Sequence, residues 1–421
     1  MMTSKGPYSL RLPHYWKFIL LAFLVISSGI LFFERYWQIQ SPETQEINLG
    51  SSEKLEGVDT FDVGSTASDD TTTTKIIASI TSTNSTIIST TSTISPNQAS
   101  PSPNPAGLAA SLQNGANNPT VNLVMATMRD DDISWTRNIQ IPNLNIIRYI
   151  SDSMDAEYHP PVPKKGHEAL IYHTYMHDFY DNLPDISIFT HADDSSWHVD
   201  TILNNSMAFS LSHLDLEQVM LRQYFNLRVA WLGGCPDWIN TTKGVDDAQK
   251  AEEPYMHQAF MENFDTTDDE VPEILGGPCC SQFAATRDAI RRHPKSQYRK
   301  NMDWLILTTW TDYITGRVWE HMWTWLFKGE AVDCEVEWQS YCRMYHICFG
   351  PASREKVWGL EKEKNRLKRD GVLGELMTLL GGEKAQRRLD EIDAMIAAEL
   401  EEAIETGKSE AGRANVLADL L

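Results

Sequence analysis

The first pronounced feature along the chain is an apolar run at residues 18–33, which holds sixteen residues and no charged side chain. Tyr and Trp residues lie on both sides of the run, where an interfacial aromatic belt would place them. Because a spanning helix needs about 17–25 residues, we predict a transmembrane signal anchor over residues 18–37. The alternatives are a cleaved signal peptide, with its cleavage site at residues 27–29, and a buried soluble helix.

The charges around this run predict its orientation. Lys5, Arg11 and Lys17 precede it, whereas Glu34 and Arg35 cancel directly after it. The positive-inside rule therefore places a tail of residues 1–17 in the cytosol and the rest outside it. We expect a single-pass type II membrane protein of the secretory pathway, in the Golgi or at the cell surface.

The next region, residues 38–119, has no hydrophobic periodicity. Between residues 65 and 104, 21 of 40 positions are Ser or Thr. Such a segment buries too little apolar surface to offset its chain entropy, so we predict that it is disordered. Beside a membrane span it is typical of an O-glycosylated stalk, and an unmodified linker is the alternative.

Apolar runs alternate with polar turns over residues 120–350, which we predict to be the globular domain. Extended apolar segments, the expected strands, lie at residues 121–126, 145–150, 186–190 and 227–232. Helical spacing of apolar residues lies between them, at residues 167–180 and 214–224. Strands that alternate with helices predict an α/β fold, here a single, mainly parallel sheet with flanking helices.

The pattern changes again over residues 351–421. Residues 355–369 form a charge-dense helical pattern, and a second helix places Leu389, Ile392, Ile396 and Leu400 on one face before it ends at Gly407. We expect a helical tail that docks on the domain or on a partner. A self-associating helix pair is the alternative.

Composition narrows the classes of function. The 421 residues carry a formal net charge of −22, and a chain this acidic repels phosphate backbones, which argues against nucleic-acid binding. The sequence also lacks the glycine-rich and nucleophile-elbow motifs of kinases, dinucleotide-binding enzymes and α/β-hydrolases. Composition predicts no oligomeric state.

The predicted topology places all cysteines outside the cytosol, where disulfides persist. Their spacing lacks the paired short repeats of a structural zinc site, so we expect three disulfides with fifteen pairings open. The six cysteines are Cys235, Cys279, Cys280, Cys334, Cys342 and Cys348. Asn84, Asn204 and Asn240 begin N-glycosylation sequons, which predicts surface positions for them.

The densest polar cluster follows the expected strand at residues 186–190. Strand ends of open α/β sheets bind ligands, so we expect His191 and His198 to line a site there. Asp193 and Asp194 are candidate ligands for Mn²⁺ or Mg²⁺, which would neutralise a leaving diphosphate. An ordinary solvated turn explains the two aspartates equally well.

Two further clusters precede it. Asp130, after the first expected strand, is a candidate to accept hydrogen bonds from a uracil or ribose, and an acidic helix start is the alternative. Gly166 and His167 open a helix behind two lysines, which favours a bound phosphate; a plain loop-to-helix junction is the alternative.

The last cluster lies on a helical pattern near residue 320. Arg317, Glu320 and His321 share one face of that helix, which predicts a catalytic base or a diphosphate clamp. A structural Arg317–Glu320 pair is the alternative.

Seven ordered segments of the domain resemble a known family. They are residues 124–135, 166–180 with 182–185, 188–198, 226–228 with 234–236, 279–287, 316–320 and 342–348. Together they resemble a fungal family without an assigned function, domain of unknown function 3431, whose members are typically anchored or secreted. The resemblance covers about residues 121–350. The family is in turn loosely similar to single-sheet sugar-nucleotide glycosyltransferases.

The resemblance also indicates which of the candidate residues match the family pattern and which depart from it. At the helix opening, Gly166 and Glu168 match the family pattern, whereas His167 stands where the family carries an Arg. The pattern after the third strand rests on His191, Trp197 and His198 more than on the two aspartates. Ser340 stands where relatives carry another cysteine.

These inferences predict a glycosyltransferase-like domain that transfers a sugar from a nucleotide donor to a glycan. Glu320 and His198 are the candidate catalytic residues. Asp130, Gly166, His167, Glu168, His191, Trp197 and Arg317 are the candidate substrate-binding residues. The main alternative is a non-catalytic carbohydrate- or protein-binding module at the cell surface, and a lumenal hydrolase is a third possibility.

Overall fold

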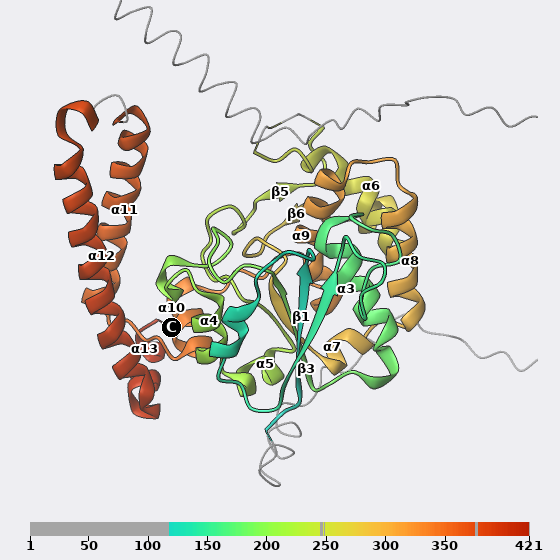
Figure 1. The fold of residues 1–421 in the computed structure, drawn as a ribbon, viewed down its shortest axis with the longest axis horizontal. Helices are drawn as coiled ribbons and strands as arrows, with labels where there is room; N and C mark the ends of the chain where they lie inside the picture. The colour runs from blue at the N-terminus through green and yellow to red at the C-terminus, as the bar shows by residue number, and fades with distance from the viewer. Residues whose placement is uncertain (1–117, 245–246, 248, 375–377, 421) are drawn as a thin grey trace, which may run out of the picture. The chain divides into compact units, whose positions relative to one another are not determined.

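The computed structural model describes residues 118–244, 247, 249–374 and 378–420 (Figure 1). The predicted anchor, the stalk and Asn84 lie outside these residues. None of the helices within the described residues is long and apolar enough to cross a membrane.

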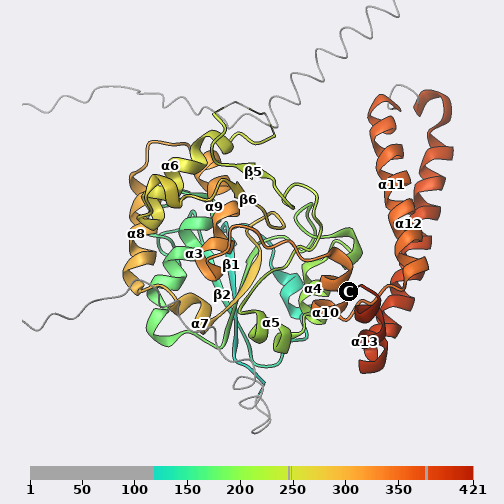
Figure 2. The same ribbon diagram turned by 180° about the vertical axis from the view of Figure 1, so that it is seen from behind.

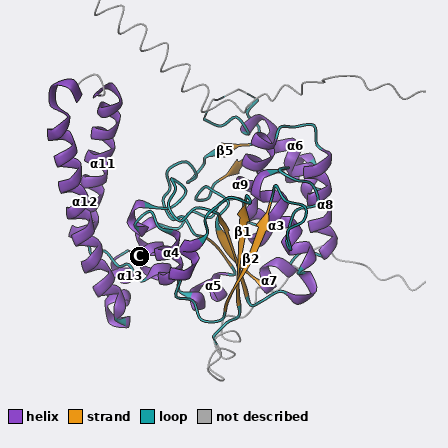
Figure 3. Cartoon of the chain, in the orientation of Figure 1, coloured by secondary structure: helices purple, strands orange, loops and turns teal. Residues whose placement is uncertain are grey.

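A mixed five-stranded sheet forms the centre of the domain (Figure 3). Its strand order is β2-β1-β3-β7-β4. The strands are β1 (Val121–Thr127), β2 (Leu144–Ile150), β3 (Ile186–His191), β4 (Tyr224–Asn226) and β7 (Phe283–Thr286). β1 pairs in parallel with β2 and β3, whereas β7 runs antiparallel to both β3 and β4. The carboxyl ends of β1, β2, β3 and β4 therefore share one edge.

The sheet corrects two sequence predictions. It is a mixed sheet, because β7, which was not recognised as a strand, runs against the other four strands. The fourth strand lies at Tyr224–Asn226 and not at residues 227–232. The chain leaves the sheet there because the Asn226 side chain accepts a hydrogen bond from the Arg228 amide, and Asp200 accepts one from the Val229 amide.

Helices cover both faces of the sheet (Figures 1 and 2). One face packs against α3 (His167–Asp178), α6 (Glu253–Phe264), α7 (Arg287–Arg291), α8 (Lys295–Leu307) and α9 (Asp312–Lys328). The other packs against α4 (Met207–His213), α5 (Leu216–Arg222) and α10 (Glu337–Tyr345). The alternation of strand side chains explains the two cores: Val124 belongs to the first, and its neighbours Leu123 and Met125 to the second.

Short elements complete the domain. They are η1 (Ser134–Asn138), η2 (Tyr180–Asn182), η3 (Thr201–Leu203), η4 (Asp268–Glu270), β5 (Ile239–Asn240) and β6 (Ile274–Leu275). Three disulfides join Cys235 to Cys334, Cys279 to Cys280 and Cys342 to Cys348.

The tail consists of α11 (Pro351–Gly374), α12 (Thr378–Lys408) and α13 (Glu410–Asp419). Ile392, Ile396 and Leu400 of α12 are buried in the second core, so their shared apolar face packs on the domain. The Cys348 amide donates to the Ala403 carbonyl over 3.0 Å. These contacts agree with the docked arrangement that the helical spacing predicted.

Candidate active site

The carboxyl edge of the sheet brings together several polar segments that are far apart in the sequence. His191 is the last residue of β3, and the loop after it continues through Trp197 and His198. The loop after β1 reaches the same place, since the Trp135 indole donates to the Ala192 carbonyl over 2.7 Å. Ligands of open α/β sheets bind at such an edge, so these loops define the candidate site.

Two histidines form a pair within this site. Their Nδ1 atoms lie 3.1 Å apart. Gln282 holds the backbone of both residues: its Oε1 accepts a hydrogen bond from the His191 amide, and its Nε2 donates one to the His198 carbonyl. Burial lowers the pKa of each imidazole, and the neighbouring His191 and Arg228 help to lower that of His198 to about 3. Both rings are therefore neutral at physiological pH. The buried Nε2 of His191 has no hydrogen-bond partner within the described chain.

Glu320 of α9 is the most perturbed carboxyl group of the site. Burial, together with the nearby carboxylate of Glu168 in the first turn of α3, raises its pKa to about 8. Gly316 allows the two helices to approach, because a Cβ there would lie 3.0 Å from the His167 ring. The described residues make no hydrogen bond to the Glu320 side chain, which is only partly buried, so it is available to exchange a proton with a ligand.

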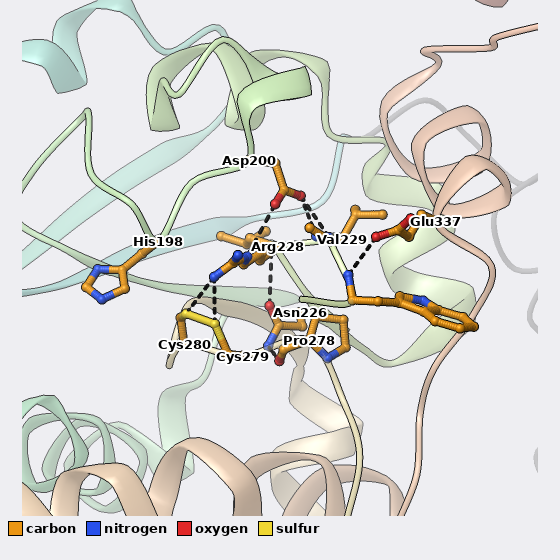
Figure 4. A network of polar contacts seen from close by, with 12 residues as sticks. His198, Asp200, Asn226, Arg228, Val229, Pro278, Cys279, Cys280 and Glu337 are labelled. Carbon is orange, nitrogen blue, oxygen red and sulfur yellow. Dashed lines mark hydrogen bonds and ion pairs between the residues drawn. A yellow bond between two sulfur atoms is a disulfide. The ribbon is translucent and has the colours of Figure 1, made fainter. Parts of the chain in front are cut away.

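Arg228 supplies a fixed positive charge beside His198. Figure 4 shows its guanidinium between the Asp200 carboxylate and the disulfide of Cys279 and Cys280. Arg228 Nε lies 3.3 Å from Asp200 Oδ1, while Asp200 Oδ2 accepts a hydrogen bond from Tyr341 over 3.1 Å. Burial raises the pKa of Asp200, and the bond from Val229 and the charge of Arg228 oppose that shift. Neither residue was a candidate from the sequence: Arg228 lay within an expected strand, and its contact with Asp200 spans 28 positions of the chain.

Trp197 lies at the rim of the site with its side chain largely in solvent. The residue is 69% exposed, although large aromatic side chains are usually buried. Its ring centroid is 4.1 Å from that of His198, and the Arg228 guanidinium lies 5.8 Å from the ring. The two neighbours hold the ring in place and leave aromatic surface free for a ligand.

The predicted metal ligands, Asp193 and Asp194, differ in their surroundings. Asp194 caps α4, because its carboxylate accepts hydrogen bonds from Ser206 Oγ (3.0 Å) and from the Ala208 amide (2.8 Å). Asp193 is exposed. Among the described residues, no group of three or more His, Cys, Asp and Glu side chains is arranged to hold a metal ion. The donor set around the two aspartates therefore does not fit a metal, and no step proposed below uses one.

The predicted phosphate site at the start of α3 is filled by a side chain. The Gly166 amide donates to Asp312 Oδ1 over 2.9 Å, and Lys165 lies 3.1 Å from the same oxygen. A carboxylate of the chain thus holds the place that the sequence suggested for a phosphate.

Arg317 and His321, which share the expected face of α9 with Glu320, both bind a different carboxylate, that of Glu252. Arg317 Nε lies 2.6 Å from Glu252 Oε2, and His321 Nε2 lies 3.0 Å from Glu252 Oε1. Although burial opposes it, these hydrogen bonds lower the pKa of Glu252 to about 2. Arg317 therefore has a structural partner, which is Glu252 and not Glu320.

Asp130 is exposed in the loop after β1. Its neighbours have structural roles: Asp131 accepts from the Met128 amide over 2.7 Å, and Asp132 accepts from the Ser134 amide over 2.8 Å. No hydrogen bond within the described chain engages the Asp130 side chain, which leaves it the free carboxylate of this loop.

Both described sequons begin at residues that solvent reaches. Asn204 is exposed and ends η3 with a left-handed backbone at φ 58°. Asn240 is half-buried in β5, and its side-chain oxygen accepts a hydrogen bond from Thr242 Oγ1 over 2.7 Å.

Comparison with known proteins identifies the family of the domain. The model of a family described as "Protein of unknown function (DUF3431)" matches residues 123–343. No curated protein and no solved structure matches the chain. The matched residues include the histidine pair, Arg228 and Glu320.

Proposed function

The chain belongs to the DUF3431 family, and from the geometry of its site we propose that residues 120–350 transfer a sugar from a nucleotide donor to a glycan hydroxyl. The observation that carries the proposal is Glu320, a partly exposed carboxyl group whose pKa is raised to about 8 and whose charge neighbours include Arg228 of the candidate site. A base with a pKa near the working pH transfers protons efficiently. Perturbed groups of this kind are concentrated in active sites.

In the proposed reaction, ionised Glu320 accepts the proton of the acceptor hydroxyl. The acceptor oxygen forms a bond to the anomeric carbon of the donor sugar, and the bond from that carbon to the nucleotide diphosphate breaks. Arg228 offers positive charge to the leaving diphosphate, and neutral His198 offers a ring N–H or lone pair. The rate should rise with pH as Glu320 ionises, with its midpoint near pH 8.

The predicted anchor and stalk are consistent with this proposal. A span over residues 18–37 and a stalk over residues 38–119 would present the domain to glycans of the Golgi or the cell surface. This layout is shared by proteins of many functions, so it supports the compartment and not the reaction.

The test uses the full-length protein with a panel of uridine and guanosine diphosphate sugars and glycan acceptors, with and without Mn²⁺. Nucleotide release is measured, and Glu320→Gln is expected to lower it by about 10²–10⁴-fold. Glu217→Gln is the matched control, because Glu217 is an exposed residue of α5. Unchanged release by the Glu320 variant would rule out the assigned base. Failure of every donor both to turn over and to raise the melting temperature would rule out the transferase itself.

Trp197 favours a second candidate, a module that binds carbohydrate without reaction. Aromatic rings present a large apolar face, and the Trp197 ring is both exposed and held in place. A binding module predicts that Trp197→Ala abolishes glycan binding, that Glu320→Gln leaves binding unchanged, and that the wild-type protein releases no nucleotide. The transferase predicts retained binding and lost turnover for Glu320→Gln.

A further inference from the structure

An open polar cavity lies between η1 and α4, apart from the histidine pair and Glu320. Its volume is about 450 Å³, within the range of about 300–1,000 Å³ typical of small-molecule sites. The polar and aromatic side chains that line it are those of Asn138, Gln140, Ser206, Phe209, Ser212 and His213. Asp194 also lines it, but none of the residues assigned above to catalysis does.

The charges around this cavity exclude two classes of ligand. No Lys or Arg lines it, so nothing there neutralises a phosphate. Its one carboxylate, Asp194, already accepts hydrogen bonds from Ser206 and from the Ala208 amide, which leaves it a poor ligand for a cation. The cavity therefore suits a neutral polar molecule.

The remaining lining groups match a sugar. Asn138 and Gln140 are exposed, and their side-chain amides have no partner within the described chain, so each offers a donor and an acceptor. The Phe209 ring packs on the His213 ring with centroids 4.1 Å apart and planes at 31°. Amides pair with hydroxyl and acetamido groups, and aromatic rings pack against the apolar face of a pyranose.

We propose that this cavity binds a neutral saccharide that carries acetamido groups. Such a sugar has two sources, a separate glycan or the chain's own N-glycan. The second arises because Asn204 begins a sequon whose third residue, Ser206, lines the cavity. The proposal is independent of the transferase activity, because it uses neither Glu320 nor the histidine pair.

The test measures binding of N,N′-diacetylchitobiose to the full-length protein by titration calorimetry. The probe is the disaccharide that begins an N-linked glycan, and sucrose is the control sugar. In a protein with Asn204→Gly, which removes the sequon while suiting the left-handed backbone, we expect measurable binding. Adding Asn138→Ala and Gln140→Ala should weaken it by about tenfold or more, since two hydrogen bonds are lost. Adding Gln258→Ala, an exposed amide on α6, should leave it unchanged.

The glycosylated protein distinguishes the two sources. If the chain's own glycan occupies the cavity, the free disaccharide binds only after Asn204→Gly. Equal binding with and without that substitution identifies a separate glycan. The proposal is overturned if the Asn204→Gly protein does not bind the disaccharide, or if the Asn138 and Gln140 substitutions leave its affinity unchanged.

Discussion

Two glutamates near the same helix show how neighbours decide the chemistry of a side chain. Glu252 lies between Arg317 and His321, and its pKa falls to about 2. Glu320 lies one turn along α9 from Arg317, but burial and the carboxylate of Glu168 raise its pKa to about 8. Arg317 and His321 direct their hydrogen bonds to Glu252, and the charge of Arg317 only partly offsets the rise in the pKa of Glu320.

This assignment predicts how stability depends on pH. The folded pKa of Glu320, about 8, lies above its ordinary value of 4.5, so the folded state holds a proton that the unfolded chain releases. This contribution to stability is fully present below about pH 4.5 and is lost progressively as the pH rises from there to about 8. The wild-type protein should therefore lose stability in urea between pH 4.5 and pH 8, whereas Glu320→Gln should flatten this loss. Equal slopes for the two proteins would contradict the raised pKa.

His198 predicts a separate loss of stability, on the acidic side of neutral pH. The pKa of His198 is lowered from 6.5 to about 3, so protons bind the unfolded chain first as the pH falls. Stability should decline between about pH 6.5 and pH 3. His198→Asn, which does not titrate in this range, should show a smaller decline when urea unfolding is compared at pH 7 and pH 4.5. A decline as large as that of the wild type would show that His198 is free to take a proton in the folded state.

The chemical types of the site were predictable from the sequence, but several partners were not. Glu320 and the two histidines were chosen because their spacing placed them on a helix face and after a strand. Glu252 is 65 positions from Arg317, and no local pattern reports such a contact. The same limit applies to Asp312, which is 146 positions from the Gly166 amide that it binds.

At the scale of elements, hydrophobic periodicity predicted the long pieces and failed on the short ones. β1 and β3 each bury an apolar run, whereas β2 buries only part of one, and the predicted bounds of all three agree to within one residue. β7 has only four residues, Phe283–Thr286, and follows a pair of cysteines, so no alternation marks it. β4 was displaced because residues 227–232 are also apolar, and tertiary hydrogen bonds to Asp200 bend that segment away from the sheet.

Two glycines of the tail make a matched test of its packing. A Cβ on Gly407 of α12 would lie 1.7 Å from the His346 carbonyl oxygen, so Gly407→Ala should separate α12 from the domain and cost about 1–3 kcal/mol. Gly359 of α11 has nothing within 4 Å of such a Cβ, and Gly359→Ala should stabilise the helix by about 0.5–1 kcal/mol. Thermal unfolding measures both changes. A neutral Gly407→Ala variant would mean that the close approach is absent in solution.

At the scale of the whole molecule, one disulfide joins distant parts of the domain. Cys235, after β4, is bonded to Cys334, which is 99 positions further along and lies between α9 and α10. Closing a loop of that length restricts the unfolded chain, so Cys235→Ala with Cys334→Ala should cost about 3–5 kcal/mol in denaturant unfolding. Either single substitution should cost about as much as the pair, because each breaks the same bond. A loss below about 1 kcal/mol would contradict the bridge.

The packing of α13 against α10 decides where the domain can be cut without loss of its structure. The family match ends at residue 343, inside α10, yet the disulfide partner of Cys342 is Cys348. Val416 of α13 packs against that bridge, and Gln339 donates to the Leu420 carbonyl. A fragment that ends at residue 343 would carry Cys342 as an unpaired thiol on α10, and α13 would no longer pack against that helix. Such a fragment is expected to form intermolecular disulfide dimers and to precipitate, whereas residues 118–421 retain a closed set of bonds.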